Sequence, residues 1–323
     1  MTTRTDPVQR DRLKGYALAA LAALCWATGG MTAKWLFTPL TSVTALWPLP
    51  PLGLTIDPID LAAARALAAM LIIMAYLALA DRRSLRIGVR DLPFLAVFGV
   101  FGLAAVHFTY FKTLSLTGVA TAILLEYLAP IAVLVFSVLF LGERLNWRLP
   151  AAVALSVTGC GLMVGVLGGG VRVSGAGIAW GLASAVFFAL YTLLGKYATG
   201  KYAPWTLLSY GLVAATLFWL VYLGPVRVIA VYRDPRAAAA VVFVAIVSTI
   251  IPFGAFLHGL HYIQATEASV TSTLEPAIAG VGAYLAFGET LGPVQLLGGA
   301  LVLGAILLVQ FTGARKESLP PPT

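Results

Sequence analysis

The chain has 323 residues, of which 60% are hydrophobic and only 11% are charged. A soluble globular domain carries about 25% charged residues, so the composition excludes an ordinary soluble protein. The net charge of +8 does not indicate nucleic acid as a partner, because the basic residues lie in short loops between apolar runs, where they orient a membrane protein.

Apolar runs recur along the whole chain, and most are about as long as the 20 residues that a helix needs to cross the hydrocarbon core. Only a helix satisfies its own backbone hydrogen bonds there. We therefore predict an all-α polytopic membrane protein surrounded by the lipid bilayer. Its ten transmembrane helices are expected at residues 15–37, 58–80, 92–113, 118–141, 149–167, 176–195, 205–223, 238–260, 268–287 and 294–311.

The lysine and arginine residues indicate the orientation of these spans, because cytoplasmic loops carry the excess of positive charge. With the N-terminal segment 1–14 inside, fourteen basic residues fall on the cytoplasmic side and four, Arg172, Arg227, Arg233 and Arg236, fall outside. We expect an integral protein of the cytoplasmic (inner) membrane with both termini in the cytoplasm. The polar tail at 312–323 is expected to be disordered.

Two loops are longer than the rest. The loop at 38–57 is rich in Pro, Leu and Trp and is expected on the membrane surface or folded partly back into it. The connection at 224–237 holds three arginines. Neither cysteine has the spacing of a disulfide or metal pair, and we expect both to be small buried hydrophobic residues.

The second half of the chain repeats the first. Five matched pairs carry the repeat: Trp26 with Phe188, Lys34 with Lys196, Lys112 with His261, Glu126 with Glu275, and Glu143 with Glu289. Each copy contains five predicted spans, an odd number, so the second copy must enter the membrane from the opposite side. We predict two inverted five-helix repeats at 15–167 and 176–311, which place a central site between them near the bilayer midplane.

Several stretches resemble those of the EamA-like group of the drug/metabolite transporter superfamily. They are WATGGMTAK from Trp26 to Lys34, Arg65 in the second span, LSLTGVATAILLEYLAP before LGERL, and QATEASVTSTLEPAIAGVGAYLAFGETL. The resemblance covers nearly the whole chain. It implies ten helices in two inverted repeats and carrier-type movement of small metabolites, often amino acids and usually outward.

Glu126 and Glu275 are the first candidates for a functional site. A charge at the centre of a bilayer costs about 2.5–3.5 kcal/mol on insertion scales, so it normally faces a cavity or a partner. Pro130 and Pro276 follow the two acids and are expected to interrupt the helices beside them. One reading is that the acids line a pathway and bind a substrate amine or a proton. The alternative is a structural ion pair with a neighbouring cation or a position near the membrane interface.

Four further candidates carry or can gain a positive charge. Arg65 lies about two turns into its span and could bind a substrate carboxylate or pair with an acid. Lys112 could approach Glu126, although we favour a position in which its ammonium reaches the membrane interface. His258 and His261 share a helix face and could relay a proton or form structural hydrogen bonds.

The aromatic residues Trp26, Tyr110 and Tyr191 are candidates to line a substrate pocket. No cofactor is expected, and no third ligand accompanies the histidines, so we predict no metal site. The sequence also lacks a phosphate-binding GxxxxGK[ST] loop. Transport must therefore be facilitated or coupled to an ion gradient.

The sequence thus predicts a non-enzymatic secondary carrier for a small-molecule substrate, most simply an amino-acid exporter that works by alternating access. The alternative is an intramembrane lipid-handling protein or enzyme with paired carboxylates. Proton coupling remains open. Small residues spaced four apart in the fifth and tenth spans indicate internal packing or a homodimer seam.

Overall fold

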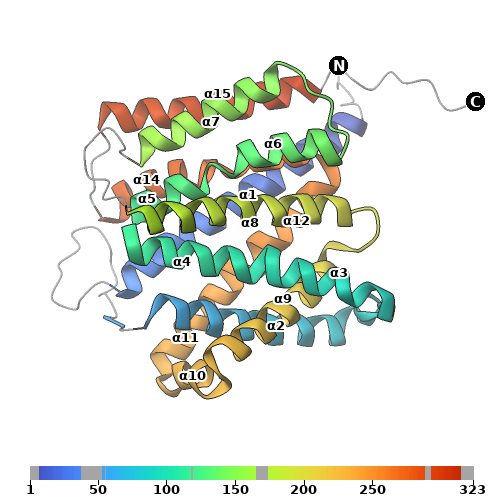
Figure 1. Cartoon of the computed structure of the whole chain (residues 1–323), viewed down its shortest axis with the longest axis vertical. Helices are drawn as coiled ribbons and strands as arrows, with labels where there is room; N and C mark the ends of the chain where they lie inside the picture. Colours follow the sequence, from blue (N-terminus) through green and yellow to red (C-terminus); the bar gives the residue numbers. More distant parts are fainter. Residues whose placement is uncertain are drawn as a thin grey trace, which may run out of the picture.

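The computed structural model describes residues 7–37, 53–54, 56–117, 119–164, 174–287 and 292–313. Every regular element within these ranges is helical. Most of the helices lie side by side in one bundle (Figure 1). The predicted loop at 38–57 lies mostly outside the described residues, and so do Glu289, residues 165–173, the side chain of Lys34 and the tail from residue 314 onward.

The helices of the first half overlap the predicted spans. They are α1 (Pro7–Phe37), α2 (Pro58–Ala80), the continuous α3 (Leu92–Val97), η3 (Phe98–Ala104) and α4 (Ala105–Thr117), the broken α5 (Val119–Glu126) and α6 (Ala129–Phe140), and α7 (Arg148–Met163).

The second half follows the same order. Its spans are α8 (Gly175–Ala198), α9 (Pro204–Leu223), the continuous α11 (Pro235–Ala245), η6 (Ile246–Ile250) and α12 (Ile251–Tyr262), the broken α13 (Ala265–Ser272) and α14 (Leu274–Phe287), and α15 (Pro293–Gly313). Both η3 and η6 are π-helical turns. The longer connection at 224–237 contains the short helices α10 (Pro225–Ala230) and η5 (Val231–Arg233).

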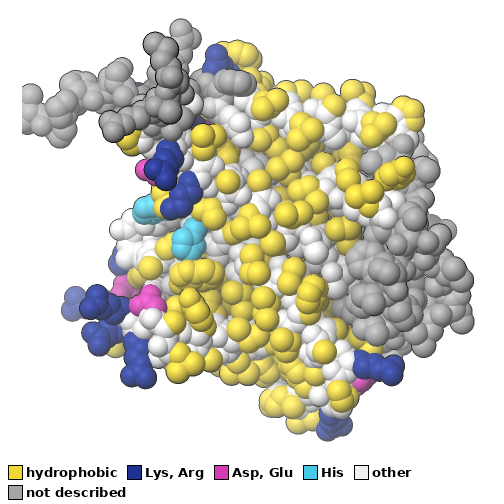
Figure 2. Space-filling model, turned by 180° about the vertical axis from the view of Figure 1, so that it is seen from behind, with side chains coloured by type: hydrophobic (Ala, Val, Ile, Leu, Met, Phe, Trp, Pro, Cys, Tyr) yellow, Lys and Arg dark blue, Asp and Glu magenta, His cyan; other side chains and the backbone are white. Residues whose placement is uncertain are grey.

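Eight stretches of the described chain are long and apolar enough to cross a membrane, and α7 is a shorter apolar helix of 16 residues. Large hydrophobic side chains such as Leu71, Leu79, Val135 and Phe140 point outward from the bundle. Figure 2 shows that hydrophobic side chains cover the middle of one face, while charged side chains gather at its edges. This distribution is that of an integral membrane protein.

Many of the charges gather at one end of the bundle, which we call the basic end. It holds the start of α1 with Arg12 and Lys14, and the loop after α8 with Lys201. Lys201 forms an ion pair of 2.7 Å with Asp91, which lies just before α3. The hydrogen bond to Asp91 raises the pKa of Lys201, so the lysine stays charged through the neutral range.

Contacts between the two halves occur in matched sets. The contact of α1 with α12 has its counterpart in that of α8 with α4, and α1 with α14 corresponds to α8 with α6. Likewise α2 packs on α11 as α9 packs on η3. The remaining large contacts, α7 with α15 and α2 with α9, join equivalent spans directly. Exchanging the two halves therefore reproduces the pattern of helix packing.

The helices α1 and α8 run in opposite directions. Gly15, early in α1, lies against Tyr262 and Ile263 at the end of α12. Lys196, at the end of α8, donates hydrogen bonds of 2.7 and 2.8 Å to the carbonyls of Leu260 and Ile263. The start of α1 and the end of α8 thus meet the same segment, so the two helices are antiparallel.

Glycines bring α7 and α15 together. A Cβ atom built on Gly159 would lie 2.7 Å from the carbonyl oxygen of Gly298, and one built on Gly298 would lie 2.7 Å from that of Gly159. Close packing of small residues is a main source of helix association in lipid. The expected small-residue contact is therefore internal, although Gly159 and Gly298 make it rather than Gly161 and Gly304.

We expect Gly298→Leu to lower the stability of the detergent-purified protein by about 1–3 kcal/mol, because backbone on the facing helix has no room to move. Thermal unfolding would measure the change. Gly30→Leu is the matched control, since Gly30 is exposed on α1 and no described atom lies within 4 Å of a Cβ on Gly30. Equal unfolding temperatures for the two variants would contradict the close contact.

Candidate functional site

Both candidate acids lie where a span is interrupted. In the first half, α5 ends at Glu126 and α6 begins at Ala129, with Pro130 in its first turn. In the second half, α13 ends at Ser272 and Glu275 lies in the first turn of α14, followed by Pro276. A proline has no N–H group and cannot continue the helical ladder. The expected interruption beside each acid is confirmed, but it follows Glu126 and precedes Glu275.

Each acid accepts a hydrogen bond from the other half of the chain. The Tyr127 hydroxyl donates to Oε2 of Glu275 at 2.6 Å. The Ser184 hydroxyl, on α8, donates to Oε2 of Glu126 at 3.0 Å. Neither acid forms an ion pair with a described residue. The structural ion pair considered as an alternative is therefore not found in the described chain.

Glu126 and Glu275 lie deep in the bundle and close enough to interact electrostatically with each other and with Tyr110. The charge of Arg65 acts on Glu126 and Tyr110 as well. All four side chains nevertheless remain partly exposed. We call the region around these four side chains the hollow, because Arg65 among them lines a pocket. The structure thus brings together four of the predicted site residues.

Arg65 lines a small pocket in this region. Its neighbours there include His107 on α4 and Thr249 in η6, with Leu103 and Trp219 among the apolar walls. The guanidinium carbon is 6.0 Å from the ring centroid of Phe111. Nδ1 of His107 is 2.7 Å from the Leu103 carbonyl oxygen, so this nitrogen carries the proton that is donated.

Trp26 and Tyr191 belong to an aromatic cluster beside the hollow. The Trp26 ring centroid lies 5.3 Å from that of Phe253, and the Tyr191 centroid lies 5.2 Å from the same ring. Tyr191 is completely buried and donates its hydroxyl to the Phe253 carbonyl. Trp26 is partly exposed, whereas Tyr191 does not reach the hollow in this conformation.

The other predicted cations lie apart from the acids. Lys112 is partly exposed and approaches the Phe108 ring at 5.9 Å, and it forms no ion pair with a described residue. His258 packs on Trp205 with 5.1 Å between the ring centroids, and its Nδ1 bonds the Gly254 carbonyl. His261 is exposed at the end of α12. Among the described residues, no three potential metal ligands gather.

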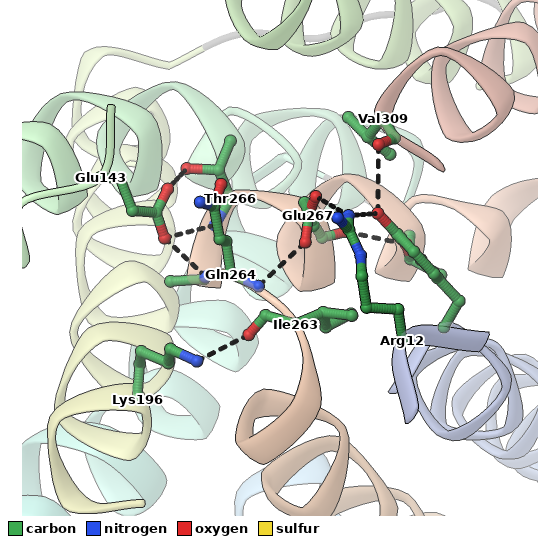
Figure 3. Close-up of polar contacts among 11 residues, drawn as sticks. Arg12, Glu143, Lys196, Ile263, Gln264, Thr266, Glu267 and Val309 are labelled. Carbon is green, nitrogen blue, oxygen red and sulfur yellow. Dashed lines mark hydrogen bonds and ion pairs between the residues drawn. The ribbon is translucent and has the colours of Figure 1, made fainter. Parts of the chain in front are cut away.

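A second polar cluster lies at the basic end, around the first turn of α13 (Figure 3). Glu143, in the loop after α6, reaches across to the second half and is only 8% exposed. Its Oε1 accepts from the backbone N–H of Ala265 at 2.7 Å, and its Oε2 accepts from the hydroxyls of Thr266 at 2.6 Å and Ser137 at 2.9 Å. A carboxylate of one half thus caps a helix of the other.

Glu267 completes this cluster, which we call the α13 latch (Glu143, Ser137, Thr266, Glu267 and Arg12). Oε1 of Glu267 forms an ion pair of 2.6 Å with Arg12 of α1, and its Oε2 accepts from the backbone N–H of Gln264. Figure 3 shows Glu143 and Arg12 approaching α13 from opposite sides. The latch therefore joins two parts of the first half, the start of α1 and the loop after α6, to one turn of the second half.

The latch was not predicted from the sequence. One sequence pattern could have indicated part of it: Glu267 stands three residues after Gln264, the spacing at which an acid caps the start of its own helix. The contact of Glu143 with Ala265 had no local signal, because 122 residues separate the two.

A membrane-embedded bundle with a polar hollow between two similar halves is the architecture of a transporter. Comparison of the sequence with protein families supports this class of protein. The profile of the EamA-like transporter family matches residues 51–165 and 175–311. The chain belongs to the EamA-like transporter family.

Relatives of this chain include named exporters. An uncharacterized transporter of Archaeoglobus fulgidus is 32% identical over 68% of this chain and 76% of its own length. A probable terminal-alkyne amino-acid exporter of Streptantibioticus cattleyicolor is 29% identical over 72% of this chain and 78% of its own. The threonine/homoserine exporter RhtA of Escherichia coli is 28% identical over 69% and 72%.

The fold also matches a solved crystal structure. The superposition covers 94% of this chain and 99% of the other, with a TM-score of 0.74 and 21% sequence identity. At this level of identity the match concerns the fold alone.

Proposed function

We propose that this transporter is a secondary carrier that exports an amino acid or a related small metabolite. The observation that carries the proposal is the convergence of Glu126 and Glu275 in one hollow, each held by a hydroxyl of the opposite half. Two acids that face a hollow without a structural cation are available to bind a substrate amine or a proton. Two relatives are named as amino-acid exporters, which supports the substrate class.

We further propose ten transmembrane spans arranged as two inverted repeats, at 15–167 and 176–311, between a segment at 1–14 and a tail at 312–323. Three observations support the repeat. The helix contacts recur when the halves are exchanged. The helices α1 and α8 run in opposite directions, and the third and eighth spans each contain a π-helical turn at a corresponding place.

Alternating access follows from this architecture as a proposal. The two halves would rock about the hollow and expose it to one side at a time. At the basic end they are joined by the α13 latch, so opening there requires Glu143 to leave the α13 N-terminus. The basic residues at that end favour a cytoplasmic position, with both termini inside and the protein in the cytoplasmic membrane.

A homodimer is a further proposal. No described atom lies within 4 Å of a Cβ built on Gly304 of α15, which leaves room for the close approach of a helix from a second copy.

Transport assays in proteoliposomes test the proposed function. Liposomes that contain the purified protein would be loaded with each labelled L-amino acid in turn, and efflux would be followed with and without a pH gradient. We expect protein-dependent efflux of a subset of amino acids, accelerated by a gradient if protons are exchanged. No protein-dependent flux for any amino acid would overturn the substrate class.

A further inference from the structure

Arg65 lies within an apolar span and forms no ion pair and no hydrogen bond among the described residues. Its guanidinium carbon lies 6.0 Å from the centroid of the Phe111 ring, and Glu126 and Tyr110 interact with its charge without direct contact. An uncompensated charge within a span is costly and normally faces a partner or a water-filled cavity. A guanidinium group also presents parallel donors that fit a carboxylate. The pocket beside Arg65 is therefore suited to an anionic ligand.

Thr249 supplies a second, independent sign of a ligand. Its side chain lines the same pocket as Arg65, is only 3% exposed, and its Oγ1 has no hydrogen-bond partner within the described chain. Leaving a buried hydroxyl unpaired costs about 1–3 kcal/mol, so such groups normally have a partner. A ligand oxygen in this pocket would provide one for Thr249 and for Arg65 together.

The pocket of Arg65 and the two acids together indicate which charged groups the ligand carries. Arg65 and Glu126 interact electrostatically but do not form an ion pair, so both charges stay available to a ligand. Tyr110 is close enough to interact electrostatically with Arg65 and with both acids. A molecule with an ammonium group at one end and a carboxylate at the other matches this arrangement.

We infer that Arg65 and Thr249 bind the carboxylate of a zwitterionic substrate, while Glu126 and Glu275 face its ammonium group. The inference deepens the proposed function and rests on it for the identity of the site. It assigns the two ends of an amino acid to two named sides of the hollow. It also predicts that amino alcohols, which lack the carboxylate, gain nothing from Arg65.

Binding to the purified full-length protein tests the assignment. The probes are the twenty L-amino acids, their matching amino alcohols, and the matching carboxylic acids without the amine, with affinity measured from thermal stabilisation. We expect Arg65→Gln to weaken amino-acid binding about tenfold to a hundredfold, as loss of a charged hydrogen-bond partner does, and to leave amino alcohols unchanged. Arg65→Lys should recover part of the loss.

Thr249→Val keeps the shape of the side chain and removes the hydroxyl. We expect about fivefold weaker amino-acid binding and no loss of folding stability, because the hydroxyl has no partner to lose. Thr216→Val is the matched control: its hydroxyl is also buried and unpartnered, but Thr216 does not line the pocket. That variant should bind amino acids as the unaltered protein does.

The outcomes separate this inference from the proposed function. Equal weakening of amino acids and amino alcohols by Arg65→Gln would overturn the inference and assign Arg65 a structural role. If none of the probes that have a carboxylate stabilised the protein against thermal unfolding, the inference would be overturned as well. Arg65-dependent binding of carboxylates without amino-acid efflux from liposomes would support the inference and overturn the export function.

Discussion

Glu275→Gln is expected to reduce amino-acid efflux driven by a pH gradient by about tenfold or more, because a hydrogen bond to a charged group contributes about 1.5–3 kcal/mol. Glu126→Gln should have an effect of the same order. Glutamine keeps the size of the side chain and can still accept from Tyr127 or Ser184, so the change removes charge and proton binding and leaves packing intact. The measurement is efflux from proteoliposomes with an imposed pH gradient.

A second assay distinguishes the two roles that the acids could have. Exchange of labelled for unlabelled substrate without a gradient needs substrate binding but no net proton movement. If an acid only exchanges protons, its glutamine variant should retain this exchange; if it binds the ammonium group, exchange should fall as well. Gradient-driven efflux that is unchanged in Glu275→Gln would refute a proton role for that residue.

The control for both variants is Asp60→Asn. Asp60 lies at the start of α2 and pairs with the exposed Arg227 at 2.7 Å, and it does not line the pocket of Arg65. Exposed ion pairs contribute about 0–1 kcal/mol. This variant should transport and unfold as the unaltered protein does, which would show that loss of a carboxylate is harmful only at the site.

Glu143→Ala is expected to lower the stability of the protein by about 3 kcal/mol, because it leaves the backbone N–H groups of Ala265 and Thr266 without their buried acceptor and removes an acceptor of the Thr266 hydroxyl. Glu143→Gln should cost less, since its amide oxygen can still accept from Ala265. Thermal unfolding in detergent measures both changes. An Ala variant as stable as the unaltered protein would show that water replaces the carboxylate at no cost.

Hydrogen exchange tests whether the latch holds the two halves together. In Glu143→Gln, the amides of Ala265 and Thr266 should exchange faster, because opening at the basic end exposes them to water. Glu267→Gln provides the comparison within the second half, since Glu267 caps the same helix from its own first turn. Faster transport in Glu143→Gln alone would indicate a latch between halves, and equal changes in both variants would indicate a helix cap only.

The positions of the spans could be predicted closely, because a bilayer demands long apolar runs. The expected 58–80 and the observed α2 (Pro58–Ala80) agree at both ends. The interruption beside the acids was also predictable, since Pro130 and Pro276 leave backbone carbonyls without donors. These features depend on local sequence alone.

The partners of the acids could not be predicted. Tyr127 meets Glu275 across 148 residues, and Ser184 meets Glu126 across 58, so each pairing depends on how the helices rotate and slide against one another. The π-helical turns η3 and η6 change that rotation, and nothing in FGVFGLA or IVSTI indicates them. Helix rotation also explains why Tyr191, which was expected at the pocket, lies in the aromatic cluster instead.

The position of each break gives the two duplicated acids unequal surroundings. Glu126 closes a helix, where the final carbonyl groups concentrate negative partial charge, while Glu275 opens one, where the initial amides concentrate positive partial charge. The local field therefore favours a bound cation at the first carboxylate and a bare carboxylate at the second. The two acids come from equivalent positions of the repeat. Because the helix break lies on opposite sides of them, the two carboxylates experience opposite local fields.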